Sequence, residues 1–204
     1  MTEDEARFTL RLTELITPAR LSSYAAVTPH EQAAMRLYEW NIDACAAVMA
    51  TVAMVEVIVR NAMDSALLHW AQKQGIDDWC DVGVLDKRTQ LDIAAGRKLR
   101  SGMGSRDGAR PVAELTFGFW RYLVAVRYLT TLWLPSLQYA FPFGDQDPRA
   151  RRAQVQLALQ RLVYVRNRSA HHEPIHSRNL LNDHNTAVML AQLVDPVAGE
   201  WVAR

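Results

Sequence analysis

The residues whose types could do chemistry gather between Val165 and Ile175. This stretch contains two arginines, one asparagine and two histidines: Arg166, Asn167, Arg168, His171 and His172. Cleaving RNA without a metal ion requires a base for the 2′-hydroxyl proton, an acid for the leaving 5′-oxygen and positive charge near the phosphate. Histidine suits the first two roles because its pKa lies near neutrality, and arginine suits the third because its planar fork binds two phosphate oxygens. The stretch therefore favours a ribonuclease site, and the alternative is a solvated, arginine-rich helix end.

The spacing of Arg166 and His171 limits what one chain can do with them. Five positions along an α-helix correspond to a rotation of about 140°, so the two side chains do not share a face. They would converge if the helix loosened near Pro174, or if a two-fold axis brought two copies of each residue into one cleft.

Metal binding is another interpretation of the histidines His171, His172, His176 and His184. The only pair with i,i+4 spacing, His172 and His176, straddles Pro174, which breaks helices, and no cysteine lies nearby. We therefore expect neither a metal site nor a cofactor. His172 also fits the position of a catalytic histidine, one residue after the preferred His171.

A second polar group lies in an otherwise apolar helical stretch and consists of Glu56, Arg60 and Asn61. Glu56 and Arg60 are one helical turn apart, so they can form a structural ion pair on one face. The functional alternative is that Arg60 and Asn61 brace or join a polar site on another helix.

The segments that must position these residues all have helical patterns. The predicted helices are Glu5–Ile16, Pro18–Tyr24, two helices between Thr28 and Gly75, Asp86–Arg100, Pro111–Pro135, one from Arg149 that delivers Arg166 to His172, Asp183–Val194 and Pro196–Val202. No strand alternation and no internal repeat appear, so the predicted fold class is all-α. The glycine-rich run Ser101–Gly108 lacks the ending of a phosphate-binding P-loop and is predicted as a surface loop.

The stretch from Thr28 to Gly75 needs a break. Thr28 and Glu31 form a capping box, and no glycine or proline follows Pro29 until Gly75. One unbroken helix would be about 65 Å long, too long for a compact domain of this size. We therefore expect a break between Asn41 and Ala50, followed by a central apolar helix, Val48–Gln74.

Composition limits the class of protein. A chain of 204 residues with 50% hydrophobic and 22% charged residues predicts one globular domain, residues 1–204, with residues 1–27 as a peripheral helical segment. The net charge is +1, but residues 101–204 carry 12 cationic against 8 acidic side chains. This basic half points weakly to a polyanionic partner, although 20 of the 23 cations are arginine, which a GC-rich genome would also produce.

The expected compartment is the cytoplasm. Cys45 and Cys80 lack CxxC spacing and are typical of core thiols in a reducing environment. The acidic start of the chain does not resemble a signal peptide, and prolines interrupt the longest uncharged run, Tyr128–Gly144. We therefore expect no membrane span.

Several pieces of the chain, in order, resemble one known family. They are Leu37–Asn41, Glu56–Asn61, Glu114–Trp120, Leu132–Pro135 and Arg166–Ile175. Arg166 to His171 is similar to the R-x4–6-H signature of the HEPN superfamily, and the set as a whole resembles its Abi-like (abortive infection, AbiD/AbiF-type) family.

The resemblance implies an all-helical HEPN-like bundle with additional peripheral helices, and a homodimer that builds a composite site. It implies metal-independent endoribonuclease activity in a toxin or phage-defence role, with an antitoxin or a non-coding RNA as a further partner. Arg166 and His171 would be catalytic, Asn167 would orient them, and His172, Glu56, Arg60 and Asn61 would support the site. Arg161, Arg168 and Arg178 would contact RNA. The alternative is a catalytically silent HEPN dimer that binds RNA or a partner protein.

Overall fold

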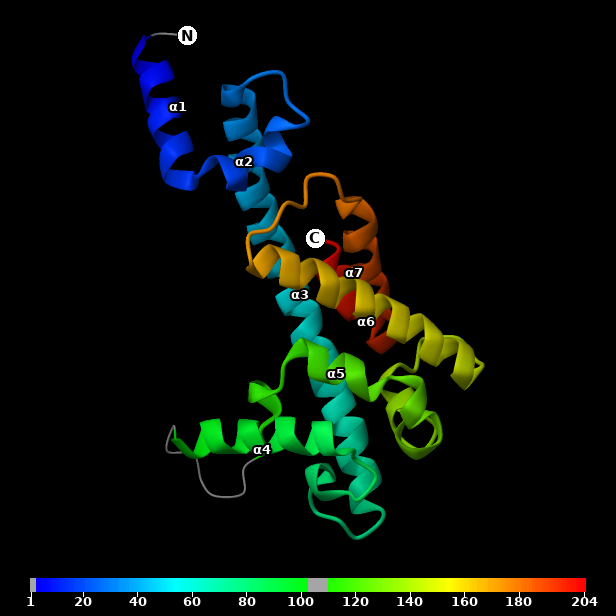
Figure 1. Ribbon diagram of the computed structural model, residues 1–204. Coiled ribbons are helices and arrows are strands. Elements are labelled where there is room, and N and C mark those ends of the chain that lie inside the picture. The colour runs from blue at the N-terminus through cyan, green and yellow to red at the C-terminus, as the bar shows by residue number, and fades with distance from the viewer. Residues whose placement is uncertain (1–2, 103–109) are drawn as a thin grey trace. The chain divides into compact units, whose positions relative to one another are not determined.

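The computed structural model describes residues 3–102 and 110–204, with side chains from Arg7 onward. Every regular element in these ranges is a helix, so the chain is all-α, as the sequence predicts (Figure 1). The predicted surface loop at Ser101–Gly108 lies mostly outside the described residues.

The α-helices are α1 (Glu3–Ile16), α2 (Pro18–Ala25), α3 (Glu31–Gln72), α4 (Lys87–Gly102), α5 (Phe117–Leu123), α6 (Pro148–Ala170), α7 (Leu180–Val194) and α8 (Pro196–Val202). Short 3-10 helices are η1 (Trp79–Asp81), η2 (Val112–Glu114), η3 (Val126–Tyr128) and η5 (Leu137–Ala140), and η4 (Leu129–Trp133) is a π-helix. The starts of α2 and α8 agree with the proline signals in the sequence.

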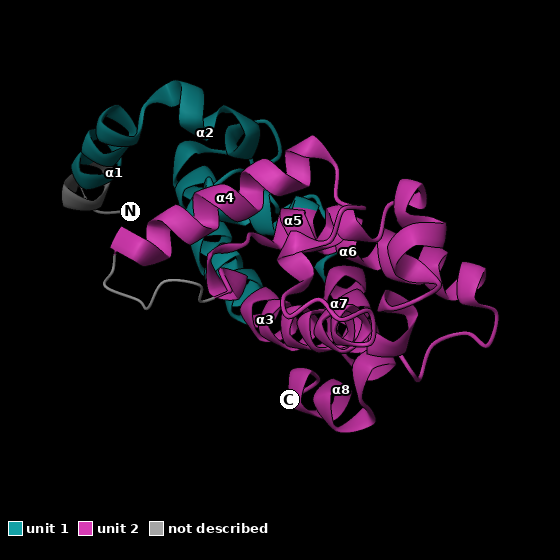
Figure 2. Cartoon of the chain, turned by 90° about the horizontal axis from the view of Figure 1, so that it is seen from below, with its two compact units in different colours: residues 1–50, 164–180 teal, residues 51–163, 181–204 magenta. Residues whose placement is uncertain are grey.

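The chain divides into two compact units (Figure 2). Unit 1 consists of residues 1–50 and 164–180, and unit 2 consists of residues 51–163 and 181–204. The helices α3 and α6 each contribute residues to both units.

The predicted break in the long helical stretch is wrong, because α3 is one helix of 42 residues (Figure 1). At about 1.5 Å per residue it is roughly 63 Å long. The prediction assumed that the helix had to fit inside one compact body, whereas residues 31–50 belong to unit 1 and residues 51–72 to unit 2. With no glycine or proline inside it, nothing local ends the helix before Gly75.

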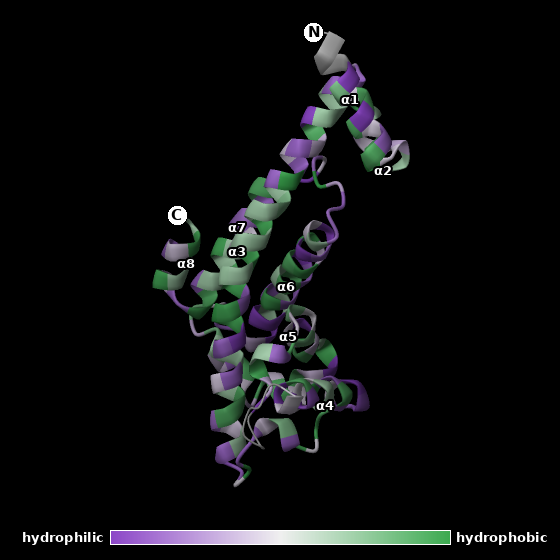
Figure 3. Ribbon diagram, turned by 90° about the vertical axis from the view of Figure 1, so that its left-hand side faces the viewer, coloured by the Kyte–Doolittle hydropathy of each residue, from purple (hydrophilic) through white to green (hydrophobic). Residues whose placement is uncertain are grey.

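The middle of α3 is strongly apolar (Figure 3). By length and composition, one 18-residue window of this helix could cross a membrane, and 22% of that window is buried in the structure. Core helices of soluble proteins have the same composition. The absence of a membrane span therefore stays a prediction, and separation of soluble and membrane fractions tests it.

The core of unit 1 forms where α2 meets the start of α3. Leu21 and Tyr24 of α2 are buried with Ala34 and Met35 of α3. Thr17 caps α2, because its hydroxyl accepts a hydrogen bond from the Arg20 amide at 3.4 Å. Helix α2 is therefore part of the core, whereas α1 leaves three large apolar side chains exposed, Phe8, Leu10 and Leu15.

The prediction of one helix from Pro111 to Pro135 is wrong. The segment instead breaks into η2, α5, η3 and η4. Large neighbouring side chains are buried here as pairs: Phe119 with Trp120, Leu123 with Val124, and Leu132 with Trp133. Adjacent residues on a helix point about 100° apart, so the segment is buried over a wide face and not along a single stripe.

Arginines of α6 donate to backbone carbonyl groups of the segments that precede α6. Arg152 donates to the Val124 carbonyl at 3.0 Å, and Arg151 donates to the Gln138 carbonyl at 3.1 Å and to the Asp145 carbonyl at 2.7 Å. Buried backbone carbonyls need such partners. Part of the arginine content of this chain is therefore structural and does not by itself indicate RNA.

Candidate functional site at the end of helix α6

The turn that carries the two histidines begins earlier than the sequence predicts. Helix α6 ends at Ala170, so the prediction that it continues to His172 is wrong. The His172 amide donates to the Ser169 carbonyl at 3.0 Å, and the Glu173 amide donates to the Arg168 carbonyl at 2.8 Å. This pair of hydrogen bonds is a Schellman motif, which ends a helix before any proline is reached.

His172 holds the left-handed position of that motif, with a φ of 53°. Glycine is the usual residue there, because a Cβ atom crowds the backbone in this conformation. A non-glycine residue costs about 1 kcal/mol at such a position. Other contacts must therefore hold the turn.

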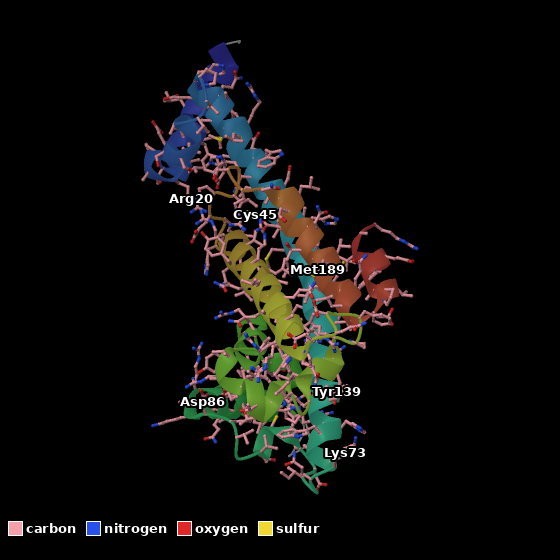
Figure 4. The ribbon with its side chains drawn as sticks, turned by 90° about the vertical axis from the view of Figure 1, so that its right-hand side faces the viewer. Arg20, Cys45, Lys73, Asp86, Tyr139 and Met189 are labelled. Atoms are coloured by element: carbon pink, nitrogen blue, oxygen red, sulfur yellow. The ribbon has the colours of Figure 1, made fainter. Side chains whose placement is uncertain are left out.

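Arg20 of α2 provides the first of these contacts. Its Nη2 atom donates to the His171 carbonyl at 3.3 Å and also to the His172 carbonyl. Figure 4 shows Arg20 beside the segment that follows α6. A guanidinium at a helix C-terminus both satisfies free carbonyls and opposes the negative end of the helix dipole.

Asn41 of α3 provides the second contact. Its Oδ1 atom accepts a hydrogen bond from the Ile175 amide at 2.7 Å, and its Nδ2 atom donates to the Glu173 carbonyl at 3.4 Å. The Asn41 side chain is fully buried, and so is Ile175. This one amide therefore fixes the chain directly after the turn.

Arg168 provides the third contact, from within α6 itself. Its Nη2 atom donates to the Pro174 carbonyl at 2.7 Å, and its Nη1 atom lies 3.1 Å from the Glu173 carboxylate. The guanidinium groups of Arg168 and Arg178 also lie over the exposed Tyr164 ring, at 5.8 and 4.9 Å from its centroid. The predicted RNA contacts of Arg168 and Arg178 stay predictions, and Arg168 already has a structural role.

The predicted catalytic side chains remain accessible beside these clamps. Arg166 is half-buried and donates to the Asn167 side-chain oxygen at 3.4 Å, and the orienting role of Asn167 stays a prediction. His171 and His172 are exposed. In the described part of the chain, no carboxylate pairs with the Arg166 side chain, and no hydrogen bond joins it to His171. The site thus offers a cation and imidazoles to a ligand.

The other predicted site residues belong to unit 2. Arg161 is paired through Nε with the buried Asp183 carboxylate at 2.6 Å. Arg60 donates to the Asn61 side-chain oxygen at 3.4 Å, the same arrangement as Arg166 with Asn167, and Glu56 is half-buried. The ion pair of Arg161 gives it a structural role, and its RNA contact remains a prediction.

Sequence reasoning missed two functional residues, Arg20 and Asn41. Asn41 carried little signal, because it lies among charged residues, between Glu39 and Asp43. In the structure the Asn41 and Cys45 side chains face each other at 3.6 Å, next to the Glu173 carbonyl. Arg20 carried no signal, since a single arginine on a short helix is ordinary.

Buried titratable groups near the turn are not ready nucleophiles. Burial raises the pKa of the Cys45 thiol, and the nearby charge of Arg20 only partly opposes this. Burial also raises the pKa of the Tyr24 hydroxyl. Both groups therefore stay protonated near neutral pH, which suits a core and not nucleophilic chemistry.

A polar cluster in unit 2 surrounds Asp86, the cap of α4. Its carboxylate accepts hydrogen bonds from the Thr89 amide at 2.9 Å, from the Tyr122 hydroxyl at 2.7 Å and from Arg127 at 2.7 Å. These bonds, first of all that from Thr89, hold the pKa of Asp86 well below its usual range. Because the carboxylate is saturated with donors, its role is to start the helix.

A groove of about 340 Å³ also lies in unit 2, between η1 and α4. Cys80, Val82 and Ile93 line it, and the ion pair of Arg97 with Asp81, at 2.9 Å, borders it. Burial strongly raises the pKa of the Cys80 thiol. Nothing in this groove selects one ligand chemistry.

Comparison with known proteins adds no family to this geometry. No protein-family model, curated protein or solved structure matches the chain. Within the described residues, no group of three or more His, Cys, Asp or Glu side chains is arranged to hold a metal ion. The function of the site is therefore inferred from its own side chains.

Proposed function

We propose that this protein is an endoribonuclease that cleaves RNA without a metal ion, with Arg166 and His171 as its catalytic residues. One observation carries the proposal. Side chains from three helices hold the turn after α6, yet the His171 imidazole stays exposed and Arg166 keeps its donors free of carboxylates. A rigid turn that presents an exposed imidazole, on the same segment as a guanidinium that no carboxylate neutralises, is suited to a phosphodiester.

In the proposed reaction the ribose 2′-oxygen attacks the phosphorus. The O2′–P bond forms, the P–O5′ bond breaks, and the products are a 2′,3′-cyclic phosphate and a 5′-hydroxyl. One proton leaves the 2′-hydroxyl and one reaches the 5′-oxygen, so the reaction needs both a base and an acid. His171 supplies one of these groups, and Arg166 binds the phosphate oxygens as negative charge builds up.

The second imidazole comes from a second copy of the chain in this proposal. Arg166 and His171 lie about 140° apart around the helix, so one chain presents them on different faces. A homodimer with a two-fold axis supplies two of each residue to one cleft. The accompanying role is that of a cytoplasmic toxin or phage-defence nuclease, controlled by an antitoxin or a non-coding RNA.

Single-stranded RNA incubated with the purified protein and a chelator tests the proposal. We expect cleavage that leaves cyclic-phosphate ends, and a loss of at least about 100-fold in rate for Arg166→Ala and for His171→Ala. Matched controls are Arg149→Ala and His69→Ala, which remove exposed side chains of the same types elsewhere. Cleavage that survives both site substitutions contradicts the proposal.

A silent RNA-binding dimer is the second candidate. The lack of a direct contact between the Arg166 and His171 side chains, among the residues described, favours it. It predicts RNA binding that weakens steeply with salt, without turnover, and that His171→Ala leaves unchanged. The cleavage assay and a salt titration of binding therefore separate the two candidates.

A further inference from the structure

Arg20 is connected to both strained positions of the described backbone. Among the described residues, two non-glycine residues have a positive φ: Thr17 at 77° and His172 at 53°. The Arg20 amide donates to the Thr17 carbonyl at 3.1 Å, and the Arg20 guanidinium donates to the His172 carbonyl. Such conformations persist only where surrounding contacts over-determine them, and they concentrate at functional sites.

The guanidinium of Arg20 uses its donors on two consecutive carbonyls, those of His171 and His172. In the described part of the chain, no carboxylate pairs with Arg20. The His171 backbone is thus held on both sides: its amide donates to the Asn167 carbonyl at 3.1 Å, and its carbonyl accepts from Arg20. Only the imidazole is left to point into solvent.

Helix α2 is itself fixed, so it can hold Arg20 in place. Tyr24, one turn after Arg20, is fully buried and packs edge-on against the Tyr38 ring, with 5.4 Å between centroids. The same Tyr24 ring contacts the His176 ring at 5.1 Å. Arg20 and Tyr24 therefore attach one face of α2 to the segment after α6 at two points.

We propose that Arg20 is a positioning residue of the candidate site: from α2 it fixes the backbone that carries the His171 imidazole. This makes residues of the N-terminal segment part of the site. The inference rests on the proposed function, because it assigns His171 the acid–base role. Both contacts come from a single Arg20 nitrogen, Nη2, so a lysine ammonium at this position, which carries several donors on one nitrogen, keeps part of the contact.

Arg20→Ala and Arg20→Lys test the inference in the full-length chain, with Arg11→Ala as the matched control. Arg11 is an exposed arginine of α1 whose partner is Glu14 at 2.6 Å, away from the turn. With a single-stranded RNA substrate, we expect Arg20→Ala to lower kcat about 10- to 100-fold while KM changes much less. Arg20→Lys restores part of this loss, and Arg11→Ala behaves as the unsubstituted protein does.

Hydrogen exchange gives a readout that does not depend on activity. The His172 and Glu173 amides form the turn of α6, and we expect their protection to fall about tenfold in Arg20→Ala. Protection of the Gly75 and Ile76 amides, which form the equivalent turn at the end of α3, stays unchanged and serves as the control turn.

The two readouts separate failure of this inference from failure of the proposed function. If the unsubstituted protein cuts RNA and Arg20→Ala has the same kcat, Arg20 is not a positioning residue. If the unsubstituted protein does not cut RNA, the proposed function fails, and exchange alone decides whether Arg20 holds the turn. Equal protection of the His172 and Glu173 amides in Arg20→Ala overturns the inference in either case.

Discussion

Two helices of this protein end in the same hydrogen-bonded turn with different residues at its left-handed position. At the end of α3 this residue is Gly75, with a φ of 75°. Its amide donates to the Gln72 carbonyl at 3.0 Å, and the Ile76 amide donates to the Ala71 carbonyl at 3.1 Å. At the end of α6 the position belongs to His172. Glycine adopts this conformation freely, whereas histidine pays about 1 kcal/mol for it.

The surroundings of the two turns explain the difference. An added Cβ at Gly75 would meet no heavy atom within 4 Å, so glycine stands there for its backbone conformation and not for lack of space. The turn at His172 is held by Arg20, Asn41 and Arg168. The comparison teaches that the end of α6 is shaped by tertiary contacts against local preference, as functional sites often are.

The largest expected loss of stability follows from Asn41→Ala, which removes the buried side chain that holds the segment after the α6 turn. The variant leaves the buried Ile175 amide without its partner, and the part-buried Glu173 carbonyl keeps only the weak Cys45 thiol donor at 3.9 Å. Each unsatisfied group costs about 1–3 kcal/mol, so we expect a loss of about 3 kcal/mol in the free energy of unfolding. Urea denaturation measures it.

The matched control for Asn41→Ala is Gln74→Ala at the end of α3. Gln74 also donates its side-chain amide to a carbonyl, that of Trp70 at 3.4 Å, but at an exposed position. We expect a change within about 0.5 kcal/mol, which is usual for surface substitutions. Equal losses for the two variants would mean that the α6 turn is no more dependent on tertiary contacts than the α3 turn.

The second-largest effect is expected for Gly75→Ala, which tests the cost of the left-handed backbone conformation alone. The added methyl group has open space around it, so steric overlap does not contribute. We expect a loss of about 1 kcal/mol from the left-handed conformation. A neutral or stabilising result, measured by urea denaturation, would remove the strain argument from His172 as well.

The sequence predicted the helices best where residues close in the sequence determine the start of a helix. Pro18 and Pro196 begin α2 and α8 as expected, and Asp86 caps α4. The prediction failed for α3 because it assumed one compact body. It failed for the end of α6 because no residue near His172 indicates a left-handed turn. A glycine at this position would have predicted the turn, whereas a histidine does not.

The candidate site could be predicted only in its chemistry. Arg166 and His171 stand out by type and by five-residue spacing. The residues that hold the turn do not stand out, because Arg20 and Asn41 lie 151 and 134 positions from the groups they bind. Contacts between residues so far apart in the sequence leave no local sequence pattern.

A smaller effect of opposite sign is expected for His172→Gly. Glycine relieves the strained φ of 53°, and its greater freedom in the unfolded chain offsets part of the gain. We expect stabilisation of about 0.5 kcal/mol, seen as a higher urea midpoint. RNA cleavage should persist, because His171 and not His172 is the proposed catalytic residue, and abolished cleavage would reverse that choice.

The smallest effect is expected at the half-exposed ion pair of Arg168 with Glu173, tested by Glu173→Gln. Surface pairs contribute about 0–1 kcal/mol, and Arg168 keeps its hydrogen bond to the Pro174 carbonyl at 2.7 Å. We expect a loss below about 0.5 kcal/mol that disappears at high salt. The variant also tests whether Arg168 contacts RNA, because removing the competing carboxylate would then tighten binding and steepen its salt dependence. If the hydrogen bond to the Pro174 carbonyl fixes the position of Arg168, RNA affinity stays the same. Arg168 then holds the α6 turn by binding its backbone and not by pairing with the Glu173 charge.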